Sequence, residues 1–274
     1  MLSAQIPLKL AVAGLGAIGL AVARRVDAGE LYGIVLVAAA ARDHDKAHRA
    51  MASFRARPPL LALPALADAA DIVLESLPAQ AFRAVAEPAI SKGRVFMPLS
   101  VGALLDHPDL IDRARATGAR ILVPTGALLG LDAVRAAAEG KIASVRMVTR
   151  KPPAGLAGAP LLRQLNINLD GLKEPRRVFE GSAREAIAGF PANVNVAVAL
   201  SLAGIGPDQT RVEIWADPTV ARNTHTISVI SDSADLTMRI ENIPSEENPR
   251  TGRITALSAL AALRRLTAAL VVGT

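Results

Sequence analysis

The chain has 274 residues and a formal net charge of +6, and 51% of its residues are hydrophobic while only 3% are aromatic. It has no cysteine, which excludes disulfides and thiolate metal sites. It also has no run of 18 apolar residues and no basic segment before an apolar one at its start, so we expect a cytoplasmic protein without a membrane span or signal peptide. Lysines and arginines are scattered and stacking aromatics are scarce, so we expect no nucleic-acid binding and a basic surface that attracts small anions.

The first half of the chain alternates apolar strands with helices. Strands are expected at residues 8–13, 34–39, 71–75, 94–99 and 119–123. Helices are expected between them, at residues 17–26, 43–53, 79–89 and 109–117. Near-continuous apolar strands in this alternation predict a parallel sheet with helices on both faces.

The pattern changes near Thr125, where strands with one polar face begin. These strands are expected at residues 141–149, 210–216, 224–231 and 236–241, with helices at 126–139, 192–203 and 254–270. Period-two alternation predicts an antiparallel or mixed sheet. The fold class is therefore α/β: a Rossmann-type parallel-sheet domain over residues 1–126 and a second α+β domain with a mixed sheet over 127–250. We expect the C-terminal helix, within 251–274, to pack back on the first domain.

The first strand runs into a G-x-G-x-x-G sequence at residues 14–19 that opens the first helix. Gly14 allows the tight turn, Gly16 lets a pyrophosphate approach the backbone, and Gly19 lets the helix pack against the strand. The helix N-terminus adds free N–H groups and the positive end of its dipole. A plain strand–helix turn is the alternative, but this context favours dinucleotide binding.

The residue that selects the cofactor is expected about 20 positions after the glycines, at the end of the second strand. Asp43 would reach a ribose 2′-hydroxyl, and Arg42 would hold the 2′-phosphate of the phosphorylated cofactor. Asp43 is equally suited to cap the helix that follows. The sequence leaves NAD and NADP both open.

The chain has four histidines. His44 and His48 are four residues apart on a polar helix, but no third ligand accompanies them, so a solvated face is favoured over a metal site. His107 precedes a proline and is typical of a turn. His225 shares a strand face with Ile227, which fits either a buried core histidine or a catalytic base with an ordinary pKa near 6.5.

Two further segments resemble parts of a binding site. Asn193 and Asn195 open a helix and either cap it or bind a nicotinamide amide or a carboxylate. Gly126 lies where the chain passes from the first domain to the second, and small residues there let a flat ring approach the backbone. A hinge is the alternative at Gly126, and the two interpretations are compatible.

Taken together, these segments resemble the L-aspartate dehydrogenase family over the whole chain. The resemblance rests on the glycine loop and on residues 99–104, 125–132, 148–153, 190–196, 216–218, 223–225 and 245–249. It implies a Rossmann domain, a second domain that forms a homodimer, and NAD- or NADP-dependent oxidation of aspartate. Iminosuccinate would form first and then give oxaloacetate and ammonia, or feed pyridine-nucleotide biosynthesis.

The resemblance also implies roles for residues. His225 would be the catalytic histidine, and Ala127 and the region of Asn193 would contact the nicotinamide. A substrate with two carboxylates needs donors, and for these Lys151 is the preferred cation, with Asn193 or Asn195 as neutral donors; no metal is expected. Residues 75–78 look atypical on the adenosine side, and Thr125 stands where serine is commoner. The expected cofactor contacts are Gly14, Gly16, Ala17, Ile18, Gly19, Arg42, Asp43, Pro78, Ser100, Gly126, Ala127 and Asn193.

Two other functions compete with this one. A dehydrogenase of the same fold would act on another small amino or hydroxy acid. A non-catalytic dinucleotide-binding protein would need no buried histidine beside the cofactor, and His225 therefore argues against it.

Overall fold

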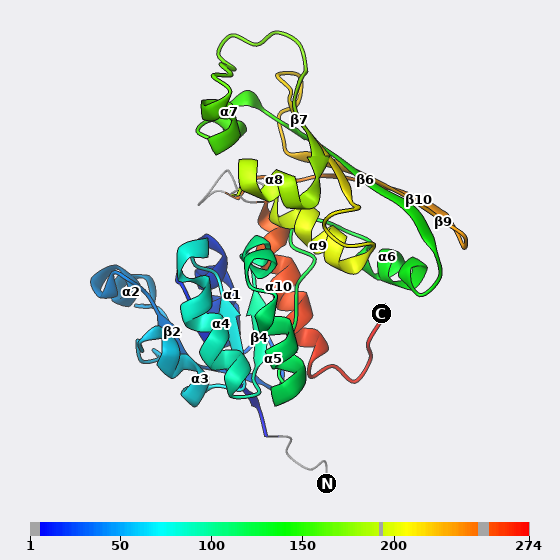
Figure 1. Cartoon of the computed structure of the whole chain (residues 1–274). Coiled ribbons are helices and arrows are strands. Elements are labelled where there is room, and N and C mark those ends of the chain that lie inside the picture. The colour runs from blue at the N-terminus through cyan, green and yellow to red at the C-terminus, as the bar shows by residue number, and fades with distance from the viewer. Residues whose placement is uncertain (1–5, 192–193, 246–251, 274) are drawn as a thin grey trace. The chain divides into compact units, whose positions relative to one another are not determined.

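The structure is a computed structural model that describes residues 6–191, 194–245 and 252–273. The chain divides into two compact units (Figure 1). The first unit is Met1–Pro124 with Thr255–Val271, and the second is Thr125–Ile254 with Val272–Thr274. Each unit has one five-stranded sheet.

The sheet of the first unit is parallel throughout, with the strand order β2-β1-β3-β4-β5, which confirms the predicted Rossmann-type sheet. Most of its residues are fully buried, as the continuous apolar runs require. The last strand pairs over only two residues, fewer than the sequence predicts. The strands are β1 (Leu8–Ala13), β2 (Ile34–Ala40), β3 (Ile72–Glu75), β4 (Val95–Pro98) and β5 (Arg120–Ile121).

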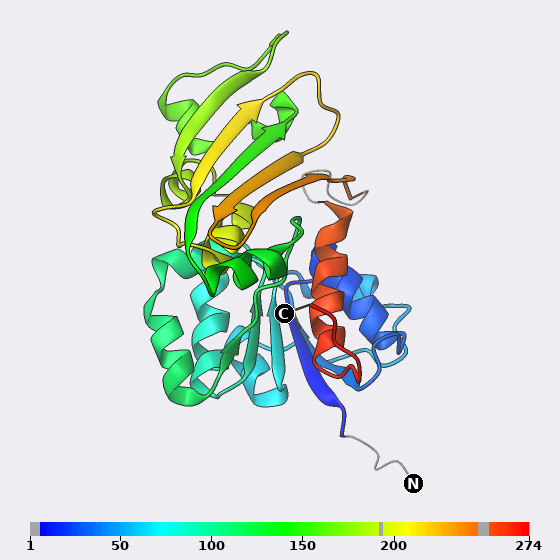
Figure 2. The ribbon, with the colours of Figure 1, turned by 90° about the vertical axis from the view of Figure 1, so that its right-hand side faces the viewer.

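Helices cover both faces of this sheet, with α1 and α10 on one side and α4 and α5 on the other (Figure 2). In α10, Ala259, Leu260 and Leu263 are buried in the same core cluster as residues of β1 and α1. The C-terminal helix therefore completes the core of the first unit. The helices are α1 (Ala17–Asp27), α2 (His44–Ala50), α3 (Leu66–Ala69), α4 (Phe82–Ser91), α5 (Asp109–Thr117) and α10 (Arg253–Arg265), with short 3-10 turns η1 (Leu63–Ala65), η2 (Ala79–Ala81) and η3 (Val101–Asp106).

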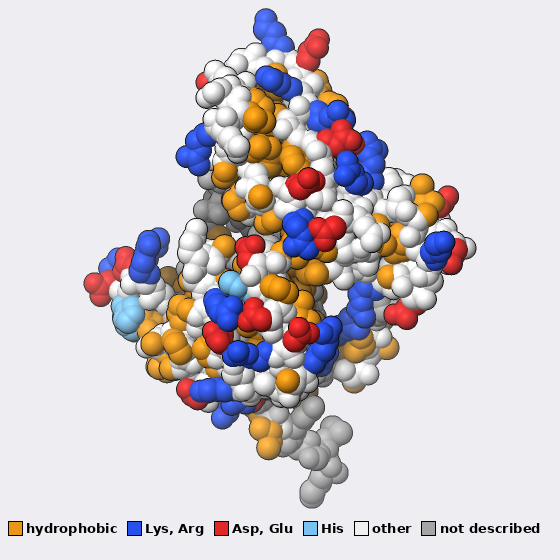
Figure 3. Space-filling view, viewed as in Figure 1, with side chains coloured by type: hydrophobic (Ala, Val, Ile, Leu, Met, Phe, Trp, Pro, Cys, Tyr) orange, Lys and Arg blue, Asp and Glu red, His pale blue; other side chains and the backbone are white. Residues whose placement is uncertain are grey.

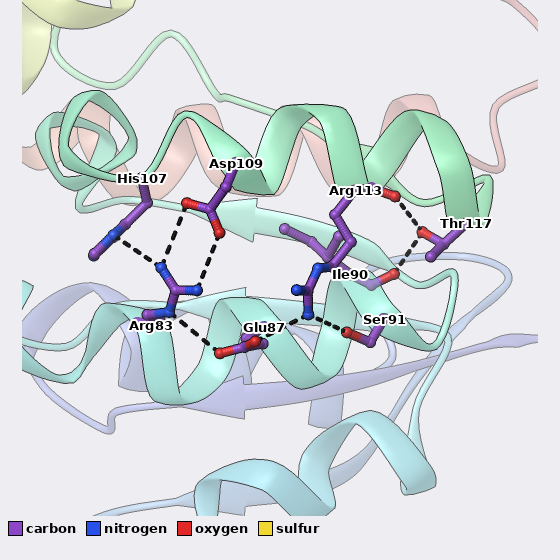
Figure 4. Close-up of polar contacts among 8 residues, drawn as sticks. All are labelled: Arg83, Glu87, Ile90, Ser91, His107, Asp109, Arg113 and Thr117. Carbon is purple, nitrogen blue, oxygen red and sulfur yellow. Dashed lines mark hydrogen bonds and ion pairs between the residues drawn. The ribbon is translucent and has the colours of Figure 1, made fainter.

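Helices α4 and α5 are joined by a polar network (Figure 4). Arg83 binds Asp109 at 3.0 Å and Glu87 at 3.2 Å, and Arg113 binds the other oxygen of Glu87 at 2.9 Å. His107 stacks on a phenylalanine ring and lies 3.4 Å from Arg83. This histidine is thus part of the helix packing, in agreement with a turn residue at a helix entry.

The sheet of the second unit is mixed, with the order β10-β9-β6-β8-β7, as the sequence predicts. Only β6 and β8 run parallel; the other neighbours are antiparallel. Helices α6 and α9 contact each other, and α8 contacts both α9 and the strands β7 and β8. The elements are β6 (Ile142–Lys151), β7 (Arg176–Ser182), β8 (Arg211–Ala216), β9 (Thr224–Ser231), β10 (Asp235–Glu241), α6 (Leu131–Ala138), η4 (Pro153–Leu156), α7 (Pro160–Gln164), α8 (Ala183–Gly189) and α9 (Asn195–Ala203).

Helix α6 begins five residues later than the predicted start at residue 126. Gly126 and Gly130 both have left-handed backbone angles, with φ of 64° and 66°. A Cβ at Gly130 would collide with the sulfur of Met238. The left-handed glycines keep the segment before α6 in a turn, where the sequence alone predicts helix.

The sequence patterns do not predict β7 and α8, nor the short helices α3 and α7. β7 is an edge strand with polar ends, so its alternation is weak. α8 opens with a capping box, in which Ser182 accepts from the N–H of Glu185 and the Glu185 carboxylate accepts from the N–H of Ser182.

Charges of both signs lie side by side on the face shown in Figure 3. Among the described residues, Arg184 and Asp208 form an ion pair at 2.6 Å. Within the described residues, no helix is long and apolar enough to cross a membrane.

Candidate functional site

The glycine loop of the first unit has the backbone that its sequence predicts. Gly14 has a φ of 98°, and a Cβ there would lie 2.7 Å from the carbonyl oxygen of Ser76. The Ser76 hydroxyl donates to the Gly14 carbonyl at 2.8 Å, and the Gly14 N–H donates to the Ala40 carbonyl at 2.8 Å. The loop is thereby fixed against the ends of β2 and β3.

The other two glycines differ in what surrounds them. A Cβ at Gly19 would overlap the Gly14 carbonyl oxygen, so Gly19 allows the close helix–loop packing. Gly16 is the N-cap of α1 without a side-chain cap, and a Cβ there would meet no atom within 4 Å. Open space in front of an uncapped helix N-terminus fits the pyrophosphate of a dinucleotide.

The other expected cofactor contacts in this unit follow the ends of neighbouring strands. β1 lies between β2 and β3, so the strand order reverses at the glycine loop, where open α/β sheets bind their ligands. Arg42 and Asp43 come directly after β2 and are exposed. The Asp43 carboxylate caps α2 by accepting from the N–H of Lys46 at 2.9 Å. The capping role of Asp43 is therefore realised, and Arg42 is the more available of the two for a 2′-phosphate.

Glu75, at the end of β3, is fully buried. Its carboxylate accepts from the N–H groups of Leu77 at 2.7 Å and Ser100 at 3.1 Å, and from the Ser100 hydroxyl at 3.1 Å. Burial raises the pKa of this carboxyl, and the hydrogen bonds oppose that shift. Glu75 therefore links the turn that carries Pro78 to the loop that carries Ser100. This structural role accounts for a buried glutamate in the atypical segment at residues 75–78.

In the second unit, one face of the sheet changes from apolar to polar along three neighbouring strands. The polar residues gather at one end of these strands. This happens because β9 lies between β6 and β10 and runs antiparallel to both, so its N-terminal end lies beside their C-terminal ends. Such residues at apolar positions of a buried face require partners or a ligand. From the apolar to the polar end, this face carries Val145, Met147, Thr149 and Lys151 on β6, Val229, Ile227, His225 and Asn223 at β9, and Leu236, Met238, Ile240 and Asn242 at β10.

His225 and Thr149 form the first polar pair of this face. They are register partners, both are 3% exposed, and Nδ1 of the ring lies 3.1 Å from the Thr149 hydroxyl. Burial, with the nearby charge of Lys151, lowers the pKa of His225 to about 3. The ring is therefore neutral in the physiological pH range.

Lys151 follows on the same face and is 5% exposed. Burial lowers its pKa to about 8. It lines a cavity of about 390 Å³, together with the exposed Arg222. The cavity lining, which lies wholly in the second unit and within the described residues, contains no carboxylate; its other residues are Pro152, Ala154, Gly155, Ala221, Asn223, Asn242, Pro244 and Gly252.

Asn242 connects this cavity with the turn before α6. Its N–H donates to the Asn223 carbonyl at 2.8 Å, and its Nδ2 donates to the Ala127 carbonyl at 3.2 Å. Its Oδ1 is buried and, within the described residues, meets no donor. The buried Asn242 side chain therefore fixes the backbone of Ala127, a residue expected to contact the nicotinamide.

The structure places the remaining expected residues as follows. Asn195 is the first residue of α9, whose N-cap is Val194, so Asn195 is not the cap that its sequence position suggests. Asn193 lies outside the described residues. His44 and His48 are exposed on α2. Residues 246–249 of the expected motif at 245–249 also lie outside the described residues.

Four residues of the candidate site were not assigned a role from the sequence: Thr149, Arg222, Asn223 and Asn242. Thr149 and Asn242 had a detectable signal, because each continues the period-two positions of an apolar strand face with a polar side chain. Arg222 and Asn223 lie in a loop, where sequence periodicity carries no information.

Comparisons with known proteins agree over the whole chain. Residues 132–266 match the model of the aspartate dehydrogenase C-terminal domain, and residues 14–124 match the NAD-binding domain of homoserine dehydrogenase. The chain is 57% identical over 273 residues to an L-aspartate dehydrogenase of Bradyrhizobium diazoefficiens, covering 99% of this chain and 96% of the relative. It is 55% identical to L-aspartate dehydrogenase 3 of Bordetella bronchiseptica, covering 100% of both.

A solved structure is similar in fold. The crystal structure of aspartate dehydrogenase from Thermotoga maritima matches with a TM-score of 0.72 at 24% identity, covering 97% of this chain and 99% of that one. The match of residues 14–124 to an NAD-binding domain supports a nicotinamide dinucleotide as the cofactor of the first unit.

Proposed function

Because the chain belongs to the aspartate dehydrogenase family, we propose that it catalyses the NAD(P)-dependent oxidative deamination of L-aspartate. The observation that carries the proposal is the cavity that Lys151 and Arg222 line, where the described residues contribute no carboxylate. A small dianionic acid fits such a lining, because Arg222 attracts a carboxylate at any pH and Lys151 adds a second positive charge below a pH of about 8. The first unit supplies the dinucleotide site, and the second supplies the acid site.

Residues of the first unit would hold the dinucleotide. The N–H groups at the start of α1 would bind the pyrophosphate beside Gly16, and the turns carrying Pro78 and Ser100 would border the adenosine and ribose. When bound, the cofactor accepts a hydride from the substrate Cα. We propose that NAD and NADP are both used, because Arg42 favours a 2′-phosphate and Asp43 keeps one carboxylate oxygen for a ribose hydroxyl.

Residues of the second unit would hold the acid. Arg222 is a permanent cation at the cavity, and Lys151 is a cation below a pH of about 8. Asn195 and Asn193 are proposed as neutral donors to the substrate, and Ala127 and Gly126 as backbone contacts of the nicotinamide. His225 is proposed to contact the reacting group and to take part in proton handling there.

The product would be iminosuccinate, which water converts to oxaloacetate and ammonia, or which another enzyme consumes in pyridine-nucleotide biosynthesis. The experiment that tests the function follows the absorbance of the reduced cofactor with aspartate, and the reverse reaction with oxaloacetate and ammonia. A panel of small amino and hydroxy acids tests the competing substrates. Tight binding of the reduced cofactor without turnover on any acid would instead support a non-catalytic protein.

We propose that the protein is a homodimer through the sheet face opposite to the helices of the second unit. Val148 and Trp215 point to this face and remain half-exposed in the single chain. Arg150 lies 4.8 Å above the Trp215 ring and binds Asp217 at 2.9 Å. A broad, twisted face with an aromatic residue and ordered arginines suits a self-complementary interface.

A further inference from the structure

The hydrogen bond between Thr149 and His225 determines which ring nitrogen carries the proton. Among the described residues, the Thr149 hydroxyl makes no other side-chain hydrogen bond. A buried hydroxyl needs an acceptor for its proton, and Nδ1 at 3.1 Å is the one within reach. Nδ1 of the neutral ring is then the acceptor, and the proton of the imidazole lies on Nε2.

This tautomer restricts what His225 can do. The hydrogen bond that the described residues make to the His225 ring is at Nδ1, so Nε2 is the nitrogen left for a ligand. A neutral ring with its proton on Nε2 donates a hydrogen bond there and cannot accept a proton at the same atom. The proton of the substrate must therefore go to another group.

Lys151 is the group placed to receive it. It is two residues beyond Thr149 on the same strand face, and it lines the cavity. Its pKa of about 8 gives a substantial fraction of free amine in mildly alkaline solution, whereas an ordinary lysine has very little.

We propose that the Lys151 amine takes the proton of the substrate's amino group, while Thr149 holds His225 so that its Nε2–H donates to the reacting group. The inference rests on the proposed oxidation of aspartate. In this step an N–H bond of the substrate ammonium breaks and an Nζ–H bond forms, so the positive charge moves to Lys151 and no electron is exchanged. The substrate keeps a neutral amine, whose lone pair assists loss of hydride from Cα, and Nζ then returns its proton to water.

The charges around Lys151 are compatible with this role. His225 faces it from β9 as a neutral ring, and Arg222 faces the same cavity as a permanent cation that favours the free amine. The Asp217 carboxylate, after β8, is engaged by Arg150 at 2.9 Å and by the Thr219 hydroxyl at 2.6 Å. Arg222 therefore remains as the fixed cation for a substrate carboxylate when Lys151 is neutral.

The first experiment needs no turnover. Nitrogen NMR of the protein labelled at histidine should show His225 with an unprotonated Nδ1 and a protonated Nε2 across the neutral and mildly alkaline range. Thr149→Val should release the ring to populate the other tautomer, while Thr149→Ser should preserve the parent pattern. A proton on Nδ1 in the parent protein would overturn the assignment of His225 as a donor.

The second experiment separates the charge of Lys151 from its basicity. Lys151→Arg keeps a cation that cannot accept a proton, and Lys151→Met removes both properties. We expect kcat to fall about a hundredfold or more in both, the scale of a lost general base. Binding of succinate, which has no amino group, should change little in Lys151→Arg and weaken in Lys151→Met. Ethylamine should restore turnover to Lys151→Ala.

The pH profile gives the sign of the effect. In the parent enzyme kcat should rise as the pH passes about 8, because the free amine is the active form, and this limb should be absent in Lys151→Arg. Retained kcat or a retained limb in Lys151→Arg would overturn the role of Lys151. If the parent enzyme oxidises no aspartate, the proposed function fails, and the NMR pattern of His225 still confirms or refutes the tautomer.

Discussion

Replacing Gly16 by valine should abolish cofactor binding without unfolding the protein. Gly16 has a φ of −80° and a ψ of −168°, an extended conformation that valine adopts readily. A Cβ there meets no protein atom within 4 Å. The loss of a glycine N-cap and the lower entropy of the unfolded chain oppose each other, so we expect the free energy of unfolding to change by less than about 1 kcal/mol.

The effect on binding should be much larger. The two methyl groups of valine would occupy the space in which the pyrophosphate approaches the backbone. We expect the dissociation constant of the reduced cofactor to rise by at least about a hundredfold, equivalent to about 2.8 kcal/mol.

The assay pairs a fluorescence titration with the reduced cofactor and thermal unfolding of the protein without ligand. Gly19→Ala is the matched control, because its Cβ would overlap the Gly14 carbonyl oxygen and must therefore displace the loop. The control should lose thermal stability, whereas Gly16→Val should not. Gly16→Val with unchanged cofactor affinity would refute dinucleotide binding at this loop.

Four further predictions concern other parts of the molecule. Arg42→Ala should weaken NADP binding more than NAD binding, and an equal loss would place Arg42 outside the ribose pocket. His225→Ala should lower kcat about a hundredfold, which is the scale of one hydrogen-bond donor lost from a transition state, and cofactor affinity should change little. A variant with near-parental kcat and a lower melting temperature would show that His225 is only a core residue. Sedimentation at micromolar concentration should show a dimer, and a monomer would contradict the proposed interface. Ser182→Ala should lower the free energy of unfolding by about 1 kcal/mol through loss of the capping box with Glu185, measured by denaturant titration, and an unchanged value would mean that the cap contributes nothing.

The sequence predicted the features that depend on local patterns. The parallel sheet of the first unit followed from its apolar runs, and the conformation of Gly14 followed from the spacing of the glycines. The left-handed glycines before α6 were missed, because no local pattern distinguishes a glycine that ends a turn from one that starts a helix. The edge strand β7 was missed because its alternation is weak.

The candidate acid site could be predicted only in part. His225 and Lys151 were singled out from the sequence, but their neighbours depend on strand pairing. Thr149 and His225 are 76 residues apart, and only the register of β6 against β9 brings the hydroxyl to Nδ1. Burial of that pair in turn sets the pKa of His225.

The sequence by itself determined the apolar strands β1 to β4 and the phosphate-binding loop, because these depend on residues within a few positions of one another. Tertiary structure alone decided which polar residues meet at the end of the second sheet and which of them are buried. Pairing of distant strands placed Asn242 beside Ala127, and removal of water lowered the pKa of Lys151 to about 8. Both are non-local effects, because desolvation and strand register depend on what the rest of the chain packs around a side chain.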